Sequence, residues 1–167
     1  MIKLKLTALF SFILGLAVLL PSCKEDDIYL HENIFSKQNI PMNGSQVVPP
    51  NSSIATGSLN VEYNRREKTL SYTIRWENLS GAPTSIAIYG LADAGFLAPP
   101  APLGPFTNGI AQTITGFPTT ITGSYSGTLY VDGVLIRETD LLNGKYYVLI
   151  RTAAFPAGQI RGQIDFR

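Results

Sequence analysis

Two segments of strict alternation between apolar and polar residues constrain the fold of this 167-residue chain more than any other feature. The apolar positions of the two segments are Leu59, Val61, Tyr63, Leu70, Tyr72, Ile74 and Trp76. A period of two is typical of β-strands, because successive side chains of a strand point to opposite faces of the sheet. A short charged segment, residues 65–68, separates the two runs. The pattern therefore predicts a β-hairpin with one buried and one solvated face, and it places Trp76 in the core.

The rest of the chain also favours short strands joined by turns. It contains 15 Gly and 11 Pro, and no segment has the period of a helix. Further strands are expected from residue 34 onwards and within 84–90, 110–115, 123–132, 145–152 and 159–166. Residues 98–106 contain four prolines and are expected to form an extended surface loop. We therefore expect an all-β protein, an antiparallel immunoglobulin-like Greek-key β-sandwich of about 7–9 strands.

The two C-terminal strands can be aligned by their apolar residues. Pairing Ile150 with Gly162 collects the apolar side chains of both strands on one face of the sheet. The same register places Arg151 directly across from Arg161 on the opposite face. Two like charges in this position repel each other by a few tenths to about 1 kcal/mol. A compensating group is therefore expected beside the two arginines.

Two interpretations of this arginine pair remain open. In the first, a nearby carboxylate such as Asp165 or Glu77 neutralises the arginines, and Tyr89 stacks on one guanidinium. In the second, Arg151, Arg161 and Tyr89 form a binding site for an anionic ligand, because planar guanidinium groups suit carboxylates and phosphates.

The N-terminus has the features of a lipoprotein signal peptide. Lys3 and Lys5 precede an apolar stretch that covers residues 6–20. This stretch is shorter than the roughly 20 residues that span a bilayer comfortably. It runs into Leu-Pro-Ser-Cys, which resembles a bacterial lipobox and ends at Cys23, the one cysteine of the chain. The alternative is an ordinary signal peptide with an incidental cysteine.

These features predict three parts of the chain and a location. Residues 1–22 are expected to be a lipoprotein signal peptide, residues 23–33 a polar tether that begins at the lipidated Cys23, and residues 34–167 the folded domain. Residues 24–27 are Lys-Glu-Asp-Asp, which resembles the surface-export signal of Bacteroidetes lipoproteins. We expect an outer-membrane lipoprotein held by its lipid and displayed at the cell surface, with the periplasmic face as the alternative.

Composition argues against several classes of function. A formal net charge of +1 gives no basic footprint for nucleic acid. One His and one Cys exclude the usual multi-histidine metal and catalytic sites and any internal disulfide. The sequence contains no phosphate loop, nucleophile elbow or metal-binding motif. We therefore expect no enzymatic activity, no metal and no cofactor.

Several segments resemble CHRD domains, which are named after chordin. The matching segments are residues 46–50, 55–57, 70–79, 142–148 and 153–164. The last of these contains Pro-Ala-Gly-Gln-Ile-Arg-Gly-Gln and is similar to the family's "P.GEIRGQ" ending. The resemblance covers about residues 34–167 and implies a β-sandwich that acts as an extracytoplasmic binding or structural module.

The chain departs from the CHRD pattern at three histidines. Residues 87–90 are Ala-Ile-Tyr-Gly where the family commonly has His-Ile-His-Gly, and residues 151–153 are Arg-Thr-Ala where it has His-Thr-Ala. A metal role of those histidines is therefore not expected here. We expect a non-enzymatic binding or structural lipoprotein of the cell envelope, with an envelope protein or a glycan as partner. The alternative is an envelope enzyme or redox protein with an unrecognised site.

Overall fold

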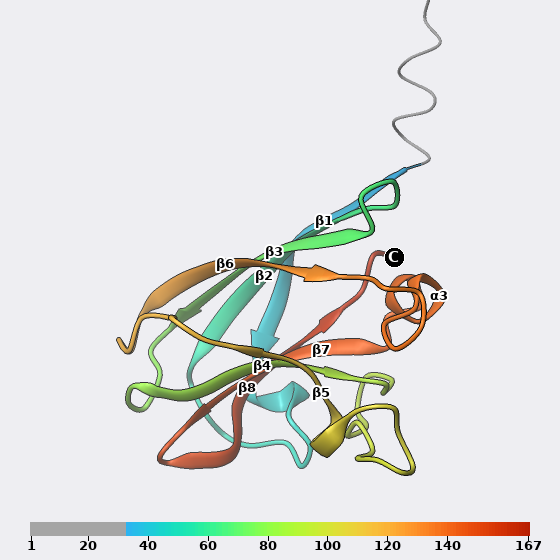
Figure 1. Ribbon diagram of the computed structural model, residues 1–167. Helices are drawn as coiled ribbons and strands as arrows, with labels where there is room; N and C mark the ends of the chain where they lie inside the picture. Colours follow the sequence, from blue (N-terminus) through green and yellow to red (C-terminus); the bar gives the residue numbers. More distant parts are fainter. Residues whose placement is uncertain (1–32) are drawn as a thin grey trace, which may run out of the picture. The chain divides into compact units, whose positions relative to one another are not determined.

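The computed structural model describes residues 33–167, which form eight strands, one short α-helix and two 3-10 helices (Figure 1). The predicted signal peptide, Cys23 and the tether up to residue 32 lie outside the described residues. The strands are β1 (Ile34–Asn43), β2 (Thr56–Asn64), β3 (Thr69–Glu77), β4 (Pro83–Gly90), β5 (Ile110–Ile114), β6 (Gly123–Tyr130), β7 (Tyr146–Thr152) and β8 (Phe155–Ile164). The helices are η1 (Gly44–Gln46), η2 (Thr107–Gly109) and α3 (Glu138–Leu142). Among the described residues, no helix has the length and apolar character that crossing a membrane requires.

All eight strands belong to one antiparallel sheet with the order β5-β4-β7-β8-β1-β2-β3-β6. β8 and β1 share a single residue pair, Arg161 with Asn43, which divides the sheet into a first half, β5-β4-β7-β8, and a second half, β1-β2-β3-β6. The two outer edges approach each other, because Gln112 Nε2 on β5 donates to the carbonyl oxygen of Thr128 on β6 at 2.9 Å. The expected all-β antiparallel fold is therefore confirmed, as a sandwich that almost closes into a barrel.

The predicted β2–β3 hairpin and its buried face are confirmed. Leu59 pairs with Ile74, and Tyr63 pairs with Leu70. The seven apolar residues of the alternating pattern are all buried, and they pack in one core with inward-facing residues of β4, β7 and β8. Trp76 has 0% of its surface exposed, and its Nε1 donates to the carbonyl oxygen of Thr120 at 2.9 Å.

The predicted register of the β7–β8 hairpin is wrong by two residues. Gly162 pairs with Val148, and Ile150 pairs with Ile160. Residues 155–158, which lie between the two predicted strands, are instead part of β8, and Thr152 pairs with Phe155. An irregularity of the ladder beyond Ile150 takes up the difference, in a stretch where proline supplies no N–H donor. A shift by an even number leaves every side chain on its expected face.

The helix α3, which the sequence pattern did not predict, is held by Glu138. One carboxylate oxygen accepts a hydrogen bond from the Tyr63 hydroxyl at 2.9 Å, and the other accepts from Arg65 Nε at 2.9 Å and pairs with Arg65 Nη2 at 2.7 Å. These contacts join the first residue of α3 to the β2–β3 hairpin. The hydrogen bond from the Arg65 guanidinium holds the pKa of the Glu138 carboxyl below its ordinary value, against the effect of burial.

We expect Glu138→Gln to remove a pH-dependent part of the stability. Because the folded-state pKa of Glu138 is lowered, its stabilisation is present above the ordinary value of 4.5 and is lost as the pH falls through the folded-state value. Both partners remain partly exposed, so the difference in unfolding free energy at pH 7 should be no more than about 1 kcal/mol. Urea unfolding of both proteins at pH 7 and at pH 3 measures it. A difference that is equal at both pH values would contradict this assignment.

Candidate functional site

The residues predicted to form an anion site lie on the outer face of the first half, in a stack of four side chains. Tyr89 and Tyr147 are paired across β4 and β7, and their ring centroids are 5.3 Å apart with an interplanar angle of 12°. The Arg151 guanidinium carbon lies 5.2 Å from the Tyr89 ring centroid, and that of Arg161 lies 3.6 Å from the Tyr147 ring centroid. We call these four residues the arginine–tyrosine stack. Each cation in it faces the π-system of a tyrosine.

Arg161 fastens the loop that follows β4 to the sheet. Its Nη1 donates to the carbonyl oxygen of Phe96 at 2.8 Å, and its Nη2 donates to Gln163 Oε1 at 2.8 Å and to the carbonyl oxygen of Asp93 at 3.3 Å. Gln163 Nε2 in turn donates to the carbonyl oxygen of Ala92 at 2.9 Å. Arg161 is only 1% exposed, and burial lowers the pKa of its guanidinium.

The two arginines are not opposite each other, and the expected carboxylate partners are not there. Because of the register shift, Arg161 pairs with Leu149, and Arg151 pairs with Ser85 of β4. Within residues 33–167 neither arginine forms an ion pair, and Asp165 instead accepts from Arg167 Nε at 2.9 Å. Neutral oxygens and tyrosine rings therefore surround the two guanidinium groups where Asp165 or Glu77 was expected.

The predicted stacking of Tyr89 on one guanidinium is present, and the guanidinium is that of Arg151. Arg151 Nη1 donates a hydrogen bond to the Tyr89 hydroxyl. Burial raises the pKa of Tyr89, and the nearby positive charge of Arg151 opposes that change. The roles of Tyr147 and Gln163 were missed, because the alternation places them on this face without indicating their contacts with the loop.

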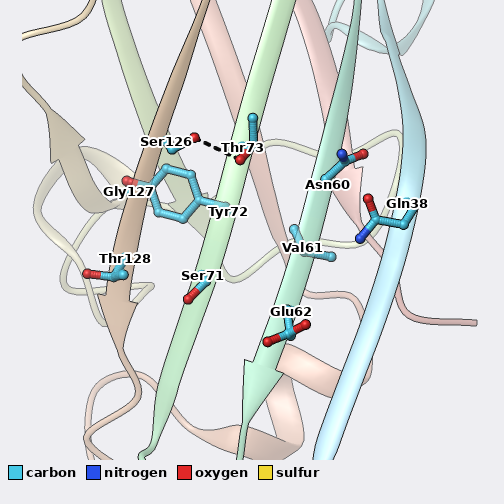
Figure 2. Close-up of a pocket in the computed structure, with 10 residues that line it drawn as sticks. All are labelled: Gln38, Asn60, Val61, Glu62, Ser71, Tyr72, Thr73, Ser126, Gly127 and Thr128. Carbon is cyan, nitrogen blue, oxygen red and sulfur yellow. Dashed lines mark hydrogen bonds between the residues drawn. The ribbon is translucent and has the colours of Figure 1, made fainter.

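A second candidate site lies on the outer face of the second half. A groove of about 550 Å³ runs across β1, β2, β3 and β6, and Figure 2 shows the side chains that line it. Its polar lining residues include Gln38, Asn60, Glu62, Ser71, Thr73 and Thr128. We call this feature the polar groove. Its lining follows from the period of two, because residues that alternate with the buried ones must face outward.

The register of the strands arranges the polar groove in rows. Asn60 pairs with Thr73, which pairs with Ser126, and the two hydroxyl oxygens of Thr73 and Ser126 are 2.8 Å apart. The next row consists of Glu62, Ser71 and Thr128. Figure 2 shows these side chains standing out from three neighbouring strands.

Several groups of the polar groove make no hydrogen bond or ion pair with any other described residue. They are the Gln38 amide, the Glu62 carboxylate and the hydroxyl groups of Ser71 and Thr128. Gln38 lies beside the irregularity of β1 between Lys37 and Ile40. Together they offer donors and acceptors, with a single negative charge, to a molecule in the groove.

The described residues contain no group of three or more His, Cys, Asp or Glu side chains that could hold a metal ion.

Comparison with known proteins gives a match to a protein-family model. No curated protein and no solved structure matches the chain. The family model of the CHRD domain matches residues 39–164, which is more than half of the chain and includes every strand from β2 to β8. The matched residues include the arginine–tyrosine stack and the rows of the polar groove. The chain therefore belongs to the CHRD domain family.

Proposed function

We propose that the chain is a lipid-anchored, non-enzymatic binding module of a cell envelope, and that its polar groove binds a neutral glycan. The observation that carries this proposal is a set of exposed polar side chains in the groove that have no partner among residues 33–167, namely Gln38, Glu62, Ser71 and Thr128. Sugar hydroxyl groups both donate and accept hydrogen bonds, so they complement a surface that combines a carboxylate, an amide and hydroxyls.

The charge of the polar groove favours a neutral ligand. Glu62 is the one ionisable carboxylate among the lining residues, and these include no Lys or Arg. An anionic polymer would meet the Glu62 charge without a compensating cation, which is unfavourable. A neutral oligosaccharide meets no charge repulsion from Glu62. Its hydroxyls can donate to the carboxylate in a charge-assisted hydrogen bond.

Substitutions in the groove test this proposal. Glu62→Gln removes the negative charge and Ser71→Val removes a hydroxyl. Hydrogen bonds to charged groups exceed neutral ones by about 1–1.5 kcal/mol, so Glu62→Gln should weaken binding by about five- to tenfold. Titration calorimetry with neutral hexasaccharides of glucose, mannose and xylose measures the affinity. Ser124→Val is the matched control, because Ser124 is exposed on the same face of β6 and does not line the groove.

Two results would contradict the glycan proposal. In one, none of the hexasaccharides binds the wild-type protein. In the other, a hexasaccharide binds, but Ser71→Val and Ser124→Val retain the same affinity as the wild type, which would place the site elsewhere. Loss of binding in the groove variants, with retention in Ser124→Val, would support it.

A second experiment tests the membrane anchor, which rests on the sequence alone. Cys23→Ala should leave the protein unprocessed or release it into the aqueous phase, because the acylated sulfur is absent. Phase separation in Triton X-114 measures this, and Ser22→Ala is the control that keeps the cysteine. Partition of processed Cys23→Ala into the detergent would mean that another anchor holds the protein. Protease treatment of intact cells then distinguishes surface display from the periplasmic face.

A further inference from the structure

A small pocket lies beside Arg161, away from the polar groove. Its volume is about 270 Å³, and it is formed by η1 and the residues that follow it, by the loop after β4, and by β8. Val47, Val48 and Ala94 supply apolar walls, while Gln46 and Arg161 supply polar groups. A mostly apolar pocket with a few polar groups is the usual form of a site for a small molecule.

The charge of Arg161 is buried without a negative partner among residues 33–167. Its three hydrogen bonds go to two backbone carbonyls and to the Gln163 amide oxygen, all of which are neutral. A guanidinium has five N–H donors, so two remain, on Nε and Nη1. Burial of a charge is costly unless an opposite charge accompanies it. The Tyr147 ring 3.6 Å from the guanidinium carbon offsets part of that cost.

We propose that this pocket binds a small carboxylate carried on an apolar group, with the carboxylate on Arg161 and the apolar group against Val47, Val48 and Ala94. The carboxylate supplies the missing negative charge and accepts a hydrogen bond from one of the two remaining N–H groups. The apolar walls favour an organic acid over inorganic phosphate, which has no apolar part to bury. This pocket and the polar groove share no lining residue. The carboxylate proposal therefore does not depend on whether the groove binds a glycan.

Thermal unfolding of the full chain with hexanoate tests the proposal. A ligand that binds only the folded state raises the melting temperature with the logarithm of its concentration. We expect a rise of about 4 °C at ten times the dissociation constant, and no rise with hexanamide or with sodium chloride at equal ionic strength. Inorganic phosphate tests the anion alone. An apolar tripeptide, with a free or an amidated C-terminus, tests whether a peptide terminus is the source of the carboxylate.

Ala94→Leu fills the pocket from an exposed position and leaves the three hydrogen bonds of Arg161 in place. It should abolish the hexanoate shift, whereas Ala153→Leu, an equal change at an exposed turn outside the pocket, should retain it. The proposal is overturned if neither hexanoate nor the free tripeptide raises the melting temperature of the wild type. It is also overturned if phosphate acts as well as hexanoate, or if the shift persists in Ala94→Leu.

Discussion

Trp76→Ala is expected to lower the free energy of unfolding by about 3–5 kcal/mol, which is a large share of the roughly 5–15 kcal/mol that stabilises a typical domain. The indole is fully buried and donates to Thr120. It also lies against Gly123 of β6, where an added Cβ would come within 2.7 Å of Trp76 Cζ2. Truncation therefore removes a packed aromatic from between β3 and β6 and leaves a cavity that the rigid sheet cannot close.

Two further variants separate packing from a general effect of losing an aromatic residue. Tyr130→Ala removes a side chain that is 59% exposed on the same strand pair, so we expect a change within about 0.5 kcal/mol. Trp76→Phe keeps an aromatic ring and loses the hydrogen bond to Thr120, so its effect should be intermediate. Urea unfolding measures the three free energies, and thermal unfolding compares Trp76→Ala with the wild type. If Trp76→Ala melts within two degrees or so of the wild type, the indole does not support the core in solution.

The β2–β3 hairpin could be predicted because the residues that determine it are close together in the sequence. Each strand alternates without interruption, and the turn between them is short and charged, so the apolar positions fix which face of the hairpin is buried. Burial of Trp76 follows from its place at the end of the alternation. Nothing distant in sequence has to be known to place these residues.

The β7–β8 register could not be predicted, because the turn-forming residues of this segment do not lie where the chain reverses. Pro156 and Gly158 are typical of turns, yet the chain reverses before them, between Thr152 and Phe155. The proline then lies in the irregular part of β8, where its missing N–H donor is tolerated. The pattern of apolar residues could still fix the faces, which is why Arg151 and Arg161 share one side of the sheet in spite of the error.

The chemistry of the candidate sites was only partly visible in the sequence. Alternation predicted an outward polar face on β2 and β3. It did not indicate that a groove forms there, or that Glu62 and Ser71 have no partner in the described part of the chain. The two arginines predicted a carboxylate beside them. The acceptors that Arg161 uses are backbone carbonyls at Asp93 and Phe96, which every loop possesses and which no side-chain pattern reveals.

Arg161→Ala is expected to destabilise the domain by about 3–4 kcal/mol, the second largest effect among these variants. The substitution leaves the carbonyl oxygens of Phe96 and Asp93 and the side-chain oxygen of Gln163 without their donor. It also uncovers one face of the Tyr147 ring. These hydrogen bonds are partly buried, so each acceptor left without a donor carries a desolvation cost. We therefore expect the loop after β4 to separate from the sheet.

Arg151 provides the matched comparison, because it belongs to the same stack and has fewer contacts. It makes one hydrogen bond, to Tyr89, and its buried Nε has no partner among the described residues. Arg151→His, which removes the guanidinium and its one hydrogen bond, should therefore cost less than about 1 kcal/mol. Arg161→Lys keeps the charge but not the planar set of donors, so its effect should lie between the two.

Limited proteolysis with chymotrypsin distinguishes loss of the loop from loss of the whole fold. Phe96 and Leu97 are 67% and 56% exposed, and cleavage there requires the surrounding backbone to open. We expect Arg161→Ala to be cut at this loop well below its midpoint of urea unfolding, and Arg151→His to resist as the wild type does. If Arg151→His is cut faster and loses more stability than Arg161→Ala, then Arg151 holds the loop and the role assigned to Arg161 is wrong.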